Sequence, residues 1–92
     1  MPSFTMVGAS FRPHSAKDVI RALSIGDEVE LRADPDNAYD DTAVGCHADG
    51  EHIGFVPKDR NADLFVRLMD GEEILAEVIS FENSLKPVLE YE

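Results

Sequence analysis

The stretch EVELRADPDNAYDDTAVGCHADGEHIGFV, residues 28–56, decides the fold. Its first five residues alternate strictly, which places a valine and a leucine on one face of a strand and charged residues on the other. The segment at 34–41 is too polar and too rich in turn-forming residues for regular structure. Residues 43–48 and the run ending at 56 then form a hairpin pattern around Asp49-Gly50, a strong turn signal. The stretch therefore predicts three strands, with one long acidic loop between the first two.

The segment before this stretch adds a strand and a helix. Residues 4–11 contain several apolar side chains and predict a first strand. Ser15, with Asp18 three residues later, resembles a weak capping box and predicts the start of a helix. Gly26 is expected to end this helix, because glycine is favoured just after a helix terminus.

The segment after it adds a second helix and a last hairpin. Asp59 is expected to cap a helix over residues 60–69, and residues 74–81 are expected to pair with 88–91. This count of about six short strands and two short helices predicts a mainly β fold. A small six-stranded barrel of the OB/SH3 type fits best, because closure hides the edges of short strands. The helices are expected to lie at its open ends.

Length and composition indicate one domain, residues 1–92, in a cytoplasmic protein. A chain of 92 residues normally makes a single domain. Its only cysteine, Cys46, cannot form an internal disulfide, which is typical of a reducing compartment. The N-terminus lacks a signal-peptide pattern, and no apolar run approaches the ~20 residues of a membrane span, so no membrane association is expected.

The net charge of −11, from 19 acidic and 8 basic residues, limits the possible partners. A protein that binds duplex DNA with its whole surface should be basic, because neutralisation of phosphates drives such binding. Any nucleic-acid site must therefore be small and local. The acidity either keeps the protein soluble or excludes wrong partners, and the sequence leaves both open.

Enzymatic motifs are missing from the sequence, so no enzyme activity and no cofactor are expected. His47 and His52 flank the predicted turn and should face each other across the hairpin. A polar cross-strand pair is the favoured interpretation, because a zinc site needs about four well-placed ligands and the sequence does not offer such a set. Cys46 should point away from His47 into the core.

The acidic loop at 34–41 contains the most distinctive residues. Its aspartates miss the spacing of an EF-hand, which argues against calcium; with Asn37 they are expected to cap local backbone amides. Tyr39 is an aromatic residue within this polar loop, and three interpretations stay open. It folds back as a lid over the core, it is exposed as a stacking platform for a base, or it anchors a protein interface.

Three segments resemble the HIRAN domain family: residues 26–31, the loop and strand at 34–44 with its Pro-Asn-x-Tyr-Asp pattern, and the Ile-Gly-aromatic-x-Pro strand end at 52–58. The opening residues 7–11 also fit. The resemblance extends from about Thr5 to Tyr91 and suggests a stand-alone member of bacterial or phage type.

This resemblance implies an OB/SH3-related barrel that recognises single-stranded DNA, captured at a free 3′-hydroxyl end, in DNA repair or at replication forks. Asn37, Tyr39 and Asp40 match the loop that holds the terminal nucleotide in DNA-binding members. There Asp40 would accept a hydrogen bond from a sugar hydroxyl, and Tyr39 would stack on the base. Phe55 matches a position close to that base, and Lys58, with Arg60 nearby, matches a phosphate contact.

The sequence departs from the DNA-binding members in two respects, its net charge of −11 and its first strand. Those members carry a basic and an aromatic residue on the first strand, whereas the matching region here, about Phe4-Thr5, has no base. Phe55 also shares strand parity with Ile53, which would make it a core residue. The phosphate-following groove would consist of Arg32, Lys58 and Arg60.

Two partner classes therefore remain. The first is single-stranded DNA, or a helicase- or nuclease-type protein that acts on it. The second is a basic protein bound by an acidic adaptor without direct nucleic-acid contact, for which Tyr39 and Phe55 would be interface anchors. The sequence leaves the oligomeric state open.

Overall fold

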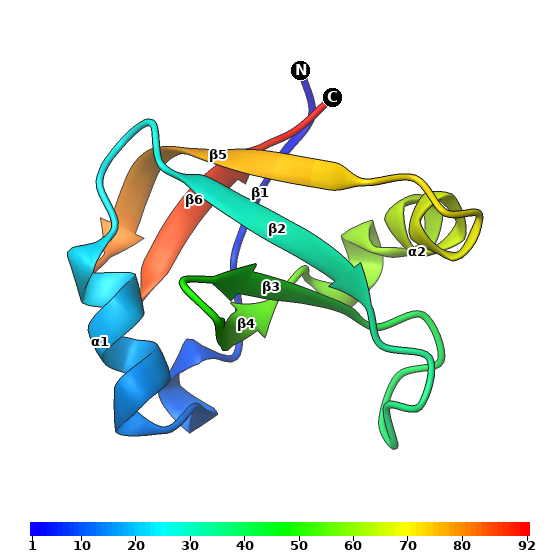
Figure 1. Ribbon diagram of the computed structural model, residues 1–92, viewed down its shortest axis with the longest axis horizontal. Helices are drawn as coiled ribbons and strands as arrows, with labels where there is room; N and C mark the ends of the chain where they lie inside the picture. Colours follow the sequence, from blue (N-terminus) through cyan, green and yellow to red (C-terminus); the bar gives the residue numbers. More distant parts are fainter.

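The chain forms one strongly curved antiparallel sheet with two helices beside it (Figure 1). The computed structural model describes residues 1–92. Across the sheet, the strands follow the order β1-β6-β5-β2-β3-β4. The predicted class, mainly β with six strands and two short helices, is confirmed. In chain order the elements are β1 (Ser3–Thr5), the 3-10 turn η1 (Ala9–Phe11), α1 (His14–Ala22), β2 (Glu28–Ala33), β3 (Val44–Ala48), β4 (Glu51–Phe55), the 3-10 turn η2 (Lys58–Arg60), α2 (Ala62–Met69), β5 (Ile74–Asn83) and β6 (Lys86–Glu90).

The two edges of the sheet are joined by the chain just after β1. Val7 and Phe55, the last residue of β4, form an isolated antiparallel bridge. In this bridge each amide donates to the carbonyl of the other residue at 2.9 Å. The contact connects the β1 edge to the β4 edge, so the curled sheet becomes a nearly closed barrel. Closure hides amide and carbonyl groups that would otherwise invite pairing with other chains.

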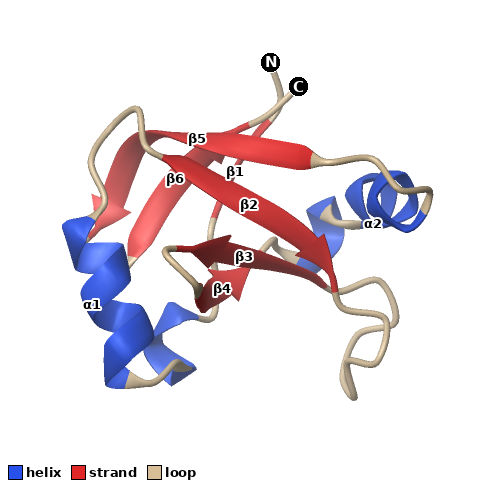
Figure 2. Ribbon diagram, viewed as in Figure 1, coloured by secondary structure: helices blue, strands red, loops and turns tan.

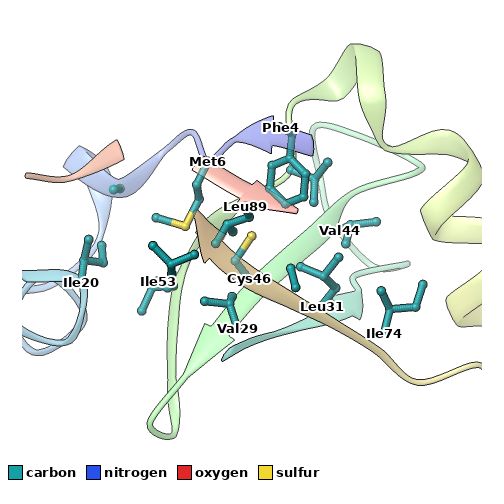
Figure 3. Packing of buried hydrophobic residues seen from close by; sticks show 14 of the residues in the cluster. Phe4, Met6, Ile20, Val29, Leu31, Val44, Cys46, Ile53, Ile74 and Leu89 are labelled. Atoms are coloured by element: carbon teal, nitrogen blue, oxygen red, sulfur yellow. The ribbon is translucent and has the colours of Figure 1, made fainter. Parts of the chain in front are cut away.

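Alternating residues of the strands fill the interior of the barrel (Figure 3). Val29 and Leu31 of β2 are buried, and so is Cys46 of β3, all three as predicted. Burial raises the pKa of the Cys46 thiol. Helix α1 adds Ile20 to this cluster and α2 adds Leu64. Because full burial of one aliphatic side chain contributes about 1.5–3 kcal/mol, the cluster is the main source of stability.

The helices flank the barrel on opposite sides (Figure 2). Helix α1 packs against β4, and α2 packs against β2. Each helix is amphipathic and turns its buried residues toward the sheet. Neither helix is long and apolar enough to cross a membrane.

The first strand is much shorter than predicted. Strand β1 ends at Thr5, and Gly8 has a left-handed backbone with φ 80° that turns the chain into η1. Glycine suits this position because the left-handed region is strained for residues with a Cβ atom. The prediction of one continuous strand over residues 4–11 is therefore wrong beyond Thr5, apart from the bridge at Val7.

The predicted cap of the first helix is not used. Helix α1 begins at His14, directly after Pro13, and no side chain caps it. The hydroxyl of Ser15 instead donates to Oε1 of Glu51 at 3.1 Å. A tertiary contact has therefore replaced the local bond that the sequence pattern suggested.

Three further boundaries differ from the prediction. Helix α1 already ends at Ala22, and Gly26, with φ 97°, belongs to the turn into β2. Asp59 lies in η2 and caps nothing, because α2 begins only after Asn61. Strand β5 continues to Asn83, which makes the last hairpin tighter than expected.

Candidate functional site

The loop between β2 and β3 is ordered by its own polar side chains. Oδ1 of Asn37 accepts hydrogen bonds from the backbone amides of Tyr39, at 2.9 Å, and Asp40, at 3.1 Å. Nδ2 of Asn37 donates to Oδ2 of Asp34 at 3.0 Å. The expected capping of local amides is therefore present, and Asn37 holds the two residues that follow it in place.

Asp40 is the centre of a second set of hydrogen bonds. Its Oδ1 accepts from the amide of Thr42 at 3.0 Å and from the hydroxyl of Thr42 at 3.2 Å. Its Oδ2 accepts from Nδ2 of Asn61 at 2.8 Å. The bond from the Thr42 amide has the largest effect on the Asp40 carboxyl and lowers its pKa. Burial acts in the opposite direction, but the bonds from Asn61 and the Thr42 hydroxyl and the charge of Lys58 also lower the pKa. The carboxylate is consequently ionised and acts only as an acceptor.

Asn61 belongs to this site, although the sequence did not indicate it. The residue is 1% exposed, and its Oδ1 accepts from the hydroxyl of Thr42 at 2.8 Å. Its side chain therefore ties the loop to the start of α2. An asparagine before a helix suggests a local cap, and only the fold brings it to Asp40, 21 residues earlier in the chain.

Tyr39 projects from the ordered loop into solvent. Its side chain is 92% exposed, while its backbone amide is held by Asn37. The interpretation of Tyr39 as a lid over the core is therefore wrong. A stacking platform and an interface anchor remain as roles for the ring.

Phe55 lies on the outer face of the barrel and not in the core. Cys46 pairs with Gly54, but His47 pairs with His52, so Ile53 is an extra residue in β4. This bulge reverses the alternation, and the half-buried Phe55 comes to lie against His52, with ring centroids 4.6 Å apart in an edge-to-face contact. The expectation from strand parity, that Phe55 is a core residue like Ile53, is therefore wrong.

His47 and His52 face each other across the hairpin, as predicted. Their rings are stacked, with centroids 4.7 Å apart and an angle of 14° between the planes. Burial lowers the pKa of both imidazoles. No group of three or more potential metal-ligating side chains occurs in the structure.

The predicted phosphate groove is brought together only in part. Lys58 lies close enough to Asp40 for its positive charge to lower the pKa of the Asp40 carboxyl. Arg60 reaches β1, where it donates to the carbonyl of Ser3 at 2.7 Å. Arg32 is engaged in an ion pair with Glu30 on β2 and does not join the other two.

A basic and an aromatic residue do occur together, at Phe11-Arg12. They follow the Phe4-Thr5 region, which was expected to match the first strand of the DNA-binding members. Phe4 is a core residue, whereas Phe11, at the end of η1, is 89% exposed. Arg12 follows it, and its Nε donates to the carbonyl of His52 at 2.9 Å. The Phe11-Arg12 pair lies in a stretch, residues 1–17, that contains no aspartate or glutamate.

These features lie on one side of the molecule. In Figure 1 the η1 turn and the β2–β3 loop both lie along the lower side, with the β3–β4 hairpin between them. Two exposed aromatic residues, Phe11 and Tyr39, belong to the η1 turn and to the β2–β3 loop, and the contacting rings of His52 and Phe55 belong to β4. Arg12 and Lys58 supply positive charge to an otherwise acidic protein.

Fold and site together define a small β-barrel binding module with an exposed aromatic on an ordered loop. The sequence matches the family described as the HIRAN domain over residues 2–90, so the chain belongs to the HIRAN family, whose members are nucleic-acid-binding modules. The crystal structure of a Lactobacillus plantarum protein, a target of the northeast structural genomics consortium, has the same fold. It is 19% identical, with a TM-score of 0.85 over 97% of this chain and 87% of that chain. No curated protein matches the sequence.

Proposed function

We propose that this domain is a non-enzymatic module that binds single-stranded DNA at a free 3′ end, in the context of DNA repair or replication forks. The observation that carries the proposal is the exposed ring of Tyr39 on a loop that is ordered by hydrogen bonds of Asn37 and Asp40. An exposed aromatic side chain with no packing role offers a face on which a base can stack. Membership of the HIRAN family supports the same class of ligand.

The chemistry of Asp40 supports recognition of a terminal hydroxyl. An ionised carboxylate offers about four acceptor positions. Three of them are taken by the two bonds from Thr42 and the bond from Asn61. The remaining position can accept a hydrogen bond from a sugar 3′-hydroxyl next to the base that stacks on Tyr39. A 3′-phosphate would instead bring negative charge to a carboxylate.

The charge distribution supports a short contact with the strand. Arg12, Lys58 and Arg60 are free of side-chain ion pairs, in a protein with 19 acidic residues, four of which lie in the loop at 34–41. For single strands the logarithm of affinity falls with the logarithm of salt concentration by about 0.7 per neutralised phosphate. Three such contacts give a slope of about −2, so binding should be weak and only moderately sensitive to salt.

Titration of a labelled dT oligonucleotide, followed by fluorescence anisotropy at low salt, tests the proposal. Base stacking on an aromatic residue is worth about 1–3 kcal/mol, so Tyr39→Ala should weaken binding about 5- to 150-fold. Tyr39→Phe is the matched control, because it keeps the ring and should bind like the original protein. Circular dichroism should show that both variants are folded. Equal affinity of Tyr39→Ala and the original protein would refute the assignment of Tyr39 as the stacking platform.

A groove on another surface favours a second candidate function, an adaptor for a basic protein. The groove has a volume of about 830 Å³ and lies between α2 and the adjoining ends of β2 and β5. Its lining combines the apolar Leu68 and Leu75 with four glutamates and two arginines. Two of the glutamates are paired with these arginines, and Glu73 and Glu92 are in no salt bridge. Partners that stay bound in a pull-down after nuclease treatment, and that are lost on Glu72→Lys/Glu73→Lys, would support the adaptor.

A further inference from the structure

The stacked histidines, His47 and His52, lie on the β3–β4 hairpin. A Cβ atom at Gly45 would lie 2.9 Å from Nε2 of His52 and 3.1 Å from Nε2 of His47. The Nε2 atoms of both rings therefore converge above the bare backbone of Gly45. His52 also contacts the ring of Phe55, which connects the pair to the proposed site.

Both rings have a nitrogen that can take up a proton. Nε2 of His52 lies 3.0 Å from the carbonyl oxygen of Gly54. A carbonyl only accepts, so this Nε2 carries the hydrogen and Nδ1 is the free acceptor of the neutral ring. His47 makes no hydrogen bond through its side chain, so its acceptor nitrogen is also free.

Four charged side chains face the pair from the neighbouring elements. Arg12, between η1 and α1, acts on both rings. Arg32 of β2 lowers the pKa of His47, and Glu30 of the same strand raises it. These two side chains are paired with each other. Asp34, at the start of the loop, raises the pKa of His52 through its negative charge. Arg12 is the one cation in this set without an acidic partner.

This environment keeps both imidazoles neutral in the free protein at neutral pH. Burial lowers the pKa of His47, and repulsion from His52 and Arg32 lowers it further. Burial lowers the pKa of His52 as well, and repulsion from Arg12 adds to the effect. The site thus holds proton-accepting groups beside a guanidinium, and the attraction of Glu30 for His47 and of Asp34 for His52 does not outweigh burial and repulsion.

We infer that Arg12, His47 and His52 form a subsite for a backbone phosphate of the bound strand, and that filling this subsite takes up a proton from solvent. The inference rests on the proposed binding of single-stranded DNA. A phosphodiester carries one negative charge, which offsets the repulsion from Arg12 and stabilises an imidazolium. The added N–H of that imidazolium can donate a charge-assisted hydrogen bond to a phosphate oxygen.

The test measures the affinity of the full chain for a dT oligonucleotide between about pH 7.5 and pH 6, at constant ionic strength and with a label that does not titrate. Uptake of one proton should increase affinity by up to about tenfold for each unit of falling pH. His47→Asn and His52→Asn should flatten this dependence. His14→Asn is the matched control, because His14 lies at the start of α1 and should leave the pH dependence unchanged.

Nuclear magnetic resonance of the original protein adds a measurement that needs no variant. The pKa values of the His47 and His52 rings should rise when the oligonucleotide is added. Binding that is independent of pH, or a pH dependence that persists in both His→Asn variants, would overturn the phosphate subsite and leave DNA binding intact. Absence of any binding across this range would refute the proposed function and the subsite together.

Discussion

Replacing Gly54 with alanine tests the close packing of β4 against Met6. A Cβ atom at Gly54 would lie 2.8 Å from Cγ and Sδ of Met6 and 2.9 Å from its Cε. Met6 is fully buried in the centre of the barrel (Figure 3). The new methyl group therefore meets most of one buried side chain, whose outer atoms must shift to admit it.

The cost of this substitution follows from the crowding. Forcing an extra methyl group into a packed core costs about 1–3 kcal/mol. For a domain of this size, about 1 kcal/mol shifts the melting temperature by roughly 4–8 °C, so Gly54→Ala should lower Tm by about 4–24 °C. Gly45→Ala is the matched control in the neighbouring strand. Its methyl group would meet only the half-exposed rings of His47 and His52, so a smaller loss is expected.

A double-mutant cycle makes the explanation refutable. Met6→Ala alone should cost about 2–5 kcal/mol through the cavity that it leaves. In that background Gly54→Ala should be nearly neutral, because the added methyl group occupies the vacated space. Urea unfolding of the four proteins measures the coupling energy, which should exceed about 1 kcal/mol. Additive effects within about 0.5 kcal/mol would refute the contact with Met6 as the reason for glycine at this position.

Three further predictions concern the loop, the core and the histidine pair. Asn61→Ala removes both side-chain bonds between the loop and α2. Amide hydrogen exchange of residues 34–43 should therefore accelerate, while that of β5 stays slow. Equal protection of the loop in the variant and in the original protein would contradict the role of Asn61 in holding the loop. The Cys46 thiol, buried and with a raised pKa, should not react with a thiol reagent until urea unfolds the domain, and fast reaction of the folded protein would disprove the packing. Burial lowers the pKa of His47 and His52 from the unfolded value of 6.5. The unfolded chain therefore binds more protons than the folded protein below that pH, and the free energy of unfolding should fall as pH decreases from about 7 to 5.5. A flat profile would argue against the buried pair.

The parts of the fold that sequence could predict are those with local signals. Strand β2 follows from its alternation, and the β3–β4 turn follows from Asp49-Gly50, where both residues have positive φ, 51° and 77°. This is the conformation that a tight hairpin turn needs. The helix caps could not be predicted in the same way, because the Ser15 hydroxyl finds its partner in Glu51, 36 residues later.

In the candidate site, too, only the local contacts could be predicted from the sequence. The bonds from Asn37 to the next turn of the loop span two or three residues, and its sequence pattern predicts them. The contact of Asn61 with Asp40 depends on the complete barrel. Phe55 was misplaced because strand parity holds only without a bulge. The glycine before it was the available signal, since glycine within a strand often marks a bulge.

The most direct test of the central claim compares two ends of the same strand. The dissociation constants of one dT oligonucleotide are measured with a 3′-hydroxyl and with a 3′-phosphate, at the same salt concentration. The Asp40 carboxylate has one acceptor position left and is ionised, so the 3′-hydroxyl strand should bind at least about tenfold more tightly, as loss of one hydrogen bond to a charged group implies. Equal affinity for the two ends, or tighter binding of the 3′-phosphate, would contradict recognition of a free 3′ end by the Tyr39-Asp40 loop.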